Sequence, residues 1–222
     1  MTMSRFMRTA IEGAATTIRD DTIAELAGGG LPVVPFAPGI DRAALTAGDD
    51  APLFVTLPIA KIGTSRNGRY YDAAMVKEIA DQVIEKRPGG NLGHLQESER
   101  AWRYDRPEVL WVGAVVRGDA AFARGYIPPY ATATRDFLAR AKAAGHGVGT
   151  SIYGRWRQGW DSTLGALRVQ AGGTLESIDF VPPSRAGVQF AGGMALAAEM
   201  LDQPRQPGTN KPSAFKRTLL DH

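Results

Sequence analysis

Apolar residues along this chain follow two spacings, and these spacings predict its elements. Short apolar runs rich in β-branched and aromatic residues predict strands, whereas apolar positions three and four residues apart predict helices. The predicted strands cover residues 53–57, 91–95, 109–117, 120–127, 166–171 and 174–181, and one more surrounds Ser151. The predicted helices cover residues 3–27, 132–144 and 193–202, and another lies between its cap Asp72 and Pro88.

Glycine, proline and polar residues separate these segments. Asn67-Gly68 and Gly118-Asp119 predict tight hairpin turns. Residues 156–165 predict a hairpin loop, and residues 31–50, rich in proline, glycine and aspartate, predict a linker.

The strands and helices together predict a mixed, mainly β fold. Their order is too irregular for a doubly wound sheet, so we expect an antiparallel β-barrel flanked by helices. We divide the chain into an N-terminal helix and linker (1–50), a compact domain (51–202) and a tail (203–222). The tail contains three prolines and few large apolar residues, and we expect it to be disordered.

Composition narrows the classes of function. The 222 residues are 44% hydrophobic and 22% charged, which are globular values, and the net charge of +3 does not by itself imply nucleic acid. With no cysteine, the chain cannot form disulfides or thiolate metal sites. No apolar run reaches the roughly 18 residues of a membrane span, and no signal peptide is evident, so we expect an intracellular protein without membrane contact.

A serine among glycines is the first candidate for chemistry. Ser151 lies in Gly-Val-Gly-Thr-Ser-Ile-Tyr-Gly at 147–154, where small residues permit close approach of another molecule. Such a serine can act as a nucleophile only if a base lies within hydrogen-bond reach. It is not the elbow of α/β-hydrolases, because the following glycine falls one residue late. The alternative is a buried serine bonded to backbone.

Histidine is the natural base for a serine at neutral pH, and the chain has three histidines. His94 follows a glycine on a predicted strand, whereas His146 follows a helix-ending glycine and His222 ends the tail. His94 could instead cap the loop after it. No two histidines have metal-ligand spacing, and no phosphate-binding glycine loop occurs, so we predict neither a metal nor a cofactor.

Two acidic residues could orient the base. Glu176 and Asp179 lie on one predicted strand but point to opposite faces, so at most one can join a given site. Both could equally lie on a solvated strand edge.

A basic and aromatic segment gives a third hypothesis. Arg-Trp-Arg-Gln-Gly-Trp at 155–160 resembles single-strand nucleic-acid binders in composition. Nucleic acid is nevertheless not our expected partner, because one hairpin with two tryptophans serves equally well as a packing or partner surface.

Four motifs in order resemble the prohead (capsid maturation) serine proteases of tailed bacteriophages, which share a fold with herpesvirus assemblin. The resemblance covers about residues 52–190. The motifs are Ser-Arg-Asn-Gly-Arg-Tyr-Tyr at 65–71, Asn-Leu-Gly-His-Leu at 91–95, the octapeptide at 147–154, and Ile-Asp-Phe-Val-Pro-Pro-Ser at 178–184.

The resemblance implies a serine endopeptidase in which His94 and Ser151 are the catalytic pair. Asp179 belongs to the fourth motif, and assemblins place their third member on a comparable later strand, so we predict Asp179 as the orienting residue. Glu176 is the main alternative and His146 a weaker one. We expect backbone N–H groups near residues 154–155 or 184–185 to bind the oxyanion.

The resemblance also implies the partners. The phage major capsid protein and scaffold protein would be substrates, processed in the host cytoplasm inside the assembling prohead; homo-oligomer formation stays open. The family's histidine motif often has an acidic residue before the histidine and a proline after it, where this chain has Gly93 and Leu95. The alternative function is therefore a catalytically inactive capsid-assembly or scaffold-binding protein with the same barrel.

Overall fold

A computed structural model describes residues 31–95, 99, 106–144, 146–187 and 195–197. The predicted helix at 3–27 and the predicted tail from 203 lie outside the described residues. Within the described part the protein is mainly β, with three helices.

The main sheet has the order β11-β1-β6-β5-β4, with all neighbours antiparallel. Its strands are β11 (Ala195–Ala197), β1 (Leu53–Lys61), β6 (Ala120–Ile127), β5 (Val109–Arg117) and β4 (Gly89–Gly90). The β5–β6 hairpin has the predicted bounds, and its turn residue Gly118 has a φ of 58°, which glycine adopts at little cost. Ala195–Ala197 is a strand paired with β1, so the helix predicted at 193–202 is wrong there.

A second antiparallel pair continues this sheet. It consists of β7 (Gly149–Arg155) and β10 (Thr174–Val181). The segment after β4 joins the two parts, since the Phe180 N–H donates to the Asn91 carbonyl and the Gly93 N–H donates to the Phe180 carbonyl. The predicted strand at 91–95 is thus reduced to an isolated parallel bridge between Leu92 and Phe180.

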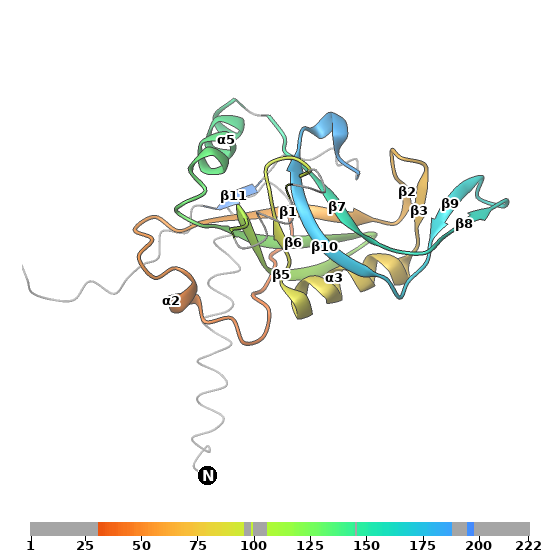
Figure 1. Ribbon diagram of the computed structural model, residues 1–222, viewed down its shortest axis with the longest axis horizontal. Helices are drawn as coiled ribbons and strands as arrows, with labels where there is room; N and C mark the ends of the chain where they lie inside the picture. Colours follow the sequence, from red (N-terminus) through yellow and green to blue (C-terminus); the bar gives the residue numbers. More distant parts are fainter. Residues whose placement is uncertain (1–30, 96–98, 100–105, 145, 188–194, 198–222) are drawn as a thin grey trace, which may run out of the picture.

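The result is a curled half-barrel sheet rather than the predicted complete barrel (Figure 1). Where β7 approaches β1, a side-chain bond from Thr150 Oγ1 to the Pro58 carbonyl, 2.6 Å long, joins the two strands. Pro58 has no N–H to donate, which suits a position at the edge of a sheet.

A smaller sheet has the order β2-β3-β9-β8. Its strands are β2 (Gly63–Thr64), β3 (Arg69–Tyr71), β9 (Ala166–Val169) and β8 (Gln158–Asp161). The β2–β3 turn is the predicted one at Asn67-Gly68, and Gly68 has a φ of 70°. Residues 156–165 were predicted to be a loop, but they contain β8, whose pairing with β9 makes a hairpin that projects from the body (Figure 1).

Helix α3 (Ala73–Lys86) packs along the main sheet and begins at the predicted cap. The Asp72 carboxylate accepts the Met75 N–H at 2.9 Å, and Arg168 bonds its other oxygen. Arg168 therefore lowers the pKa of Asp72, and the Met75 bond adds to this effect. The apolar face of α3 is fully buried and forms the centre of the core: Met75, Val76, Ile79 and Val83.

The stretch predicted to be a linker, residues 31–50, lies against the main sheet. Val34 is fully buried, and the Ala37 N–H donates to the Val112 carbonyl at 2.7 Å. Gly113 makes this approach possible, because a Cβ there would lie 2.0 Å from the Pro35 carbonyl oxygen. The stretch includes one short helix, α2 (Arg42–Leu45).

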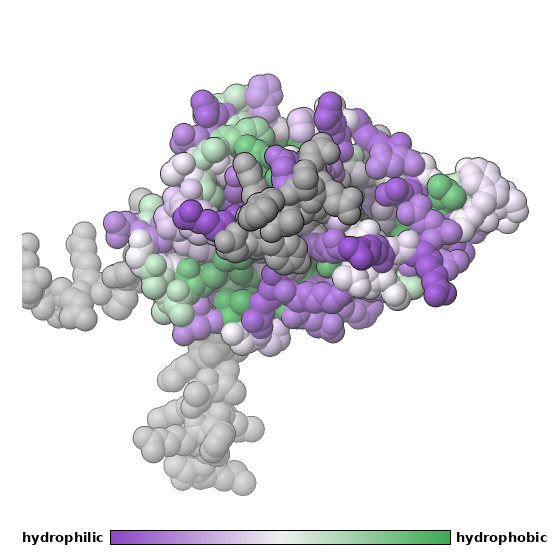
Figure 2. Space-filling model, in the orientation of Figure 1, coloured by the Kyte–Doolittle hydropathy of each residue, from purple (hydrophilic) through white to green (hydrophobic). Residues whose placement is uncertain are grey.

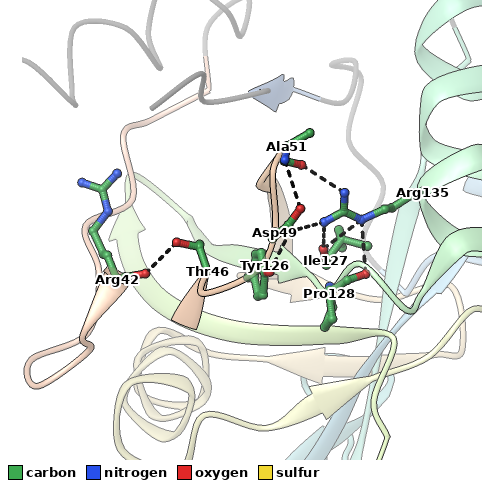
Figure 3. A network of polar contacts seen from close by, with 8 residues as sticks. All are labelled: Arg42, Thr46, Asp49, Ala51, Tyr126, Ile127, Pro128 and Arg135. Atoms are coloured by element: carbon green, nitrogen blue, oxygen red, sulfur yellow. Dashed lines mark hydrogen bonds and ion pairs between the residues drawn. The ribbon is translucent and has the colours of Figure 1, made fainter. Parts of the chain in front are cut away.

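A buried ion pair fixes the end of this stretch to α5 (Thr132–Ala143), a helix found where it was predicted (Figure 3). Arg135 bonds the Asp49 carboxylate at 2.5 Å, and its other donors reach the carbonyls of Ala51, Ile127 and Pro128. The Tyr126 hydroxyl donates to the same carboxylate oxygen at 2.7 Å. Burial raises the pKa of Tyr126, and the hydrogen bond to Asp49 raises it further, so Tyr126 acts as a donor.

None of the described helices is long and apolar enough to cross a membrane.

Replacing Arg135 should destabilise the fold. In Arg135→Met the Asp49 side chain, only 3% exposed, keeps its charge but loses its cation. Breaking a buried pair in this way costs about 3–5 kcal/mol, which urea denaturation would measure. Arg140→Met is the matched control, because Arg140 lies exposed on the same helix and its side chain donates to the Asp136 carbonyl one turn earlier. Equal stability of the two variants would contradict the structural role of the pair.

Candidate active site

Strand register brings the candidate nucleophile next to an acid. Ser151 on β7 and Asp179 on β10 are directly paired across the two antiparallel strands. Directly opposed residues project from the same face of a sheet. The two side chains therefore share one face, although 27 residues lie between them in the sequence.

His94 lies between these two side chains. Its Nε2 is 2.8 Å from Ser151 Oγ, and its Nδ1 is 2.8 Å from Asp179 Oδ2. The imidazole is 45% exposed, whereas the Asp179 side chain is 1% exposed. The structure thus brings together the three residues predicted from sequence, with the acid inside and the histidine at the surface.

The backbone before His94 is held by three successive N–H groups. Asn91 donates to Asp179 Oδ1 at 3.0 Å, Leu92 to Glu108 Oε2 at 3.1 Å, and Gly93 to the Phe180 carbonyl at 2.7 Å. Gly93 has a φ of 85°, a conformation that other residues rarely adopt. These bonds fix the position from which the His94 side chain projects.

Asp179 accepts a further hydrogen bond from Ser177 Oγ, at 3.2 Å to Oδ2. Its carboxylate therefore binds Asn91, His94 and Ser177 at once, which offsets the free energy of burying it. Sequence reasoning missed Ser177 and Glu108. Ser177 could have been found, because residues two apart on a strand share a face. Glu108 gives no such local signal.

The alternative residues lie elsewhere. Glu176 is at a β-bulge in β10 and pairs with Arg155 at 2.7 Å. His146 is exposed after α5, where its N–H donates to the Ala141 carbonyl. His222 lies outside the described residues.

A cleft of about 360 Å³ opens beside Ser151. One wall is formed by the end of β1 and the β2–β3 hairpin, and β7 forms the other side. Burial raises the pKa of Tyr71 in this cleft, while Arg69 beside it acts in the opposite direction. Residues that line the cleft include Ile59, Lys61, Arg69, Tyr71, Ser151 and Ile152.

The turn Pro183–Arg185 lies near the serine strand. The Gly187 N–H donates to the Thr150 carbonyl at 3.3 Å, and a Cβ on Gly149 would lie 2.4 Å from that of Ala186. The Arg66 guanidinium also bonds the Ser184 carbonyl, linking the β2–β3 turn to this one. The Arg185 N–H already donates to the Pro182 carbonyl.

The second expected oxyanion position, Gly154, lies further along β7. Its pairing partner is Leu175, and a Cβ on it would meet the ring of Trp156 at 2.3 Å. Trp156 itself packs against the core and donates from Nε1 to Glu78 at 3.0 Å. Of the two tryptophans in the basic and aromatic segment, Trp160 is the exposed one, at 68%.

This arrangement can activate a hydroxyl group. His94 Nε2 can accept the Ser151 proton, while Asp179 holds Nδ1–H and stabilises the imidazolium that forms. Among the described residues, no group of three or more histidine, aspartate or glutamate side chains could hold a metal ion.

Replacing Asp179 and Glu176 one at a time by their amides tests the assignment of Asp179. In Asp179→Asn the carboxylate charge is lost and the amide can donate to His94, favouring the wrong tautomer, so turnover of a serine-dependent reaction should fall by about 10⁴-fold. Glu176→Gln should stay within about twofold of the parent, because Glu176 contacts Arg155 on the surface. Steady-state kinetics and thermal unfolding of both variants would measure this; the reverse ranking would assign the role to Glu176.

Comparison with known proteins adds one finding. No protein-family model matches the sequence, and the comparison with curated proteins gives no match. The fold is similar to the solved structure of the bacteriophage T4 capsid assembly protease, gp21, with a TM-score of 0.48 and 18% identity, over 69% of this chain and 93% of that chain. That structure is of a phage capsid assembly protease, the kind of protein that the sequence motifs resemble.

Proposed function

We propose that this protein is a serine endopeptidase that cleaves capsid and scaffold proteins during phage prohead maturation. The observation that carries the chemistry is the hydrogen-bonded series Ser151–His94–Asp179, with both imidazole nitrogens 2.8 Å from their partners. The capsid and scaffold substrates come from the resemblance of the sequence motifs. The host cytoplasm, inside the assembling prohead, would be the site of action.

In the proposed mechanism Ser151 Oγ attacks the scissile carbonyl as His94 takes its proton. The tetrahedral intermediate collapses when His94 donates that proton to the leaving amine, and an acyl-enzyme remains on Ser151. A water molecule, deprotonated by His94, then attacks the ester, and the proton returns to Ser151. The cleft beside Ser151 is large enough for the side chains of a substrate segment.

A catalytically inactive protein that binds scaffold or capsid through the same fold is the second candidate. The observation that favours it is Gly93 and Leu95 beside His94, where the family often has an acidic residue and a proline.

A fluorophosphonate probe separates the two candidates, because it labels only an activated serine. We expect mass spectrometry to find the label on Ser151, and Ser151→Ala and His94→Ala should each abolish it. Ser162→Ala is the control, since Ser162 lies exposed in the β8–β9 turn. An unlabelled, folded parent protein would favour the inactive candidate.

The same variants predict a pattern in peptide-bond cleavage. Ser151→Ala and His94→Ala should each lower kcat by about 10⁴–10⁶-fold, and the double variant should be little worse than either, because the residues act as one unit. Co-expression with candidate phage capsid and scaffold proteins, followed by mass spectrometry of the products, would measure the cleavage. Near-parental turnover of His94→Ala would contradict the mechanism.

A further inference from the structure

The smaller sheet extends the cleft wall towards the projecting hairpin. Arg69 on β3, which lines the cleft, is the parallel partner of Leu167 on β9. Leu167 is in turn the antiparallel partner of Trp160 on β8. Directly paired residues share a face, so Arg69, Leu167 and Trp160 form one row across three strands.

This row lies on the inner face of the sheet. Tyr71, two residues after Arg69, lines the cleft and packs against the core, and Val169, two residues after Leu167, is 2% exposed within the core. Alternation along the strands therefore places Leu167 and Trp160 on the same face as Val169, although in the hairpin this face is exposed and Ala166 on the opposite face is buried. The hairpin reaches beyond the core, so that the outer part of this face has no described element packed beneath it.

Large apolar side chains are exposed on the β8–β9 hairpin, which extends past the core. Trp160 is 68% exposed, Leu167 38% and Leu164, in the turn between them, 41%. These are three of the six exposed large hydrophobic residues in the described part of the chain. Figure 2 shows pale and green residues gathered at this end of the molecule. Clustered exposure of this kind marks an interaction site more often than scattered exposure does.

Leu167 and Trp160 make the outer part of this face apolar, whereas Arg69 lies at its end beside the cleft. Two neighbouring arginines are engaged by acids: Arg155 by Glu176, and Arg168 by Asp72 and Asp161. A ligand of this face would therefore be recognised mainly through apolar side chains.

We propose that Trp160 and Leu167 form a distal subsite that binds an apolar segment of the protein substrate outside the scissile bond. This inference rests on the proposed endopeptidase function and names how it would select substrates. Neighbouring strands lie about 4.8 Å apart, so Trp160 is about 10 Å from Arg69 across the sheet, or roughly three residues of extended chain. The continuity with the cleft favours a substrate segment over a second copy of this chain, whose docking would not depend on the cleft.

Peptide binding to a variant that cannot cleave tests the subsite directly. The Ser151→Ala protein is mixed with one of two pools of 18-residue peptides. In both pools the six central positions are random, and the pools differ in the six residues on each side of this centre. One pool carries leucine and phenylalanine there, and the other carries serine, asparagine and glycine. We expect the apolar pool to bind about tenfold more tightly, as measured by fluorescence anisotropy.

Single substitutions test which residues cause the tighter binding of the apolar pool. Trp160→Ala and Leu167→Thr should each remove most of the tenfold difference while leaving binding of the polar pool unchanged, and thermal unfolding would verify that both variants fold. Val116→Ala is the matched control, because Val116 is 37% exposed on β5, in the other sheet, and should keep the preference. Equal binding of the two pools, or equal weakening of both by Trp160→Ala, would overturn the subsite.

Two further measurements separate the remaining outcomes. Sedimentation of the parent and Trp160→Ala should give the same oligomeric state; dissociation by Trp160→Ala would assign the face to a second copy instead and overturn the proposal. With Ser151 present, the apolar pool should be cleaved with a lower KM than the polar pool. Trp160-dependent binding without cleavage of either pool would retain the subsite and refute the endopeptidase function.

Discussion

The buried carboxylate of Asp179 is the constraint on which the arrangement of the site depends. An ionised side chain at 1% exposure must be surrounded by donors, and the donors here come from three places: the backbone at Asn91, the hydroxyl of Ser177 and the ring of His94. Satisfying this one group therefore brings the segment after β4 against β10 and turns the imidazole towards the serine. Backbone bonds of Phe180 with Asn91 and Gly93 join the same two segments, so the site and the fold are stabilised at one place.

The position of Asp179 is in turn fixed by contacts at the other end of β10. On α3, Gln82 accepts the Leu175 N–H at 2.7 Å and donates to the Gly173 carbonyl at 3.1 Å. In the middle of the strand the Trp111 indole donates to the Ile178 carbonyl at 2.9 Å. A slip of β10 by one residue would break these bonds and would turn the acid to the opposite face. Contacts of β10 with α3 and with Trp111 in the core thus fix the strand register that places Asp179 beside His94.

Local sequence signals predicted the elements that depend on local interactions. The cap at Asp72, the glycine turns at 68 and 118 and the helix at 132–143 agree with the structure. Pairing between segments far apart in the chain could not be predicted from local sequence. Strand β8 forms because it pairs with β9, and Ala195–Ala197 is extended because it pairs with β1. Proline and glycine in residues 31–50 indicated irregular backbone correctly, but they could not show that Asp49 and Val34 are buried. The proximity of His94, Ser151 and Asp179 came from family resemblance, since it depends on a register that no single strand encodes.

Pro58, where β7 approaches β1, limits the pairing of other chains along this edge. An open strand edge is a template on which another chain can pair. Pro58 lacks the N–H that such a ladder would require at that step, and its carbonyl already accepts the Thr150 hydroxyl. A continuous ladder of main-chain hydrogen bonds along this edge would therefore be interrupted at Pro58.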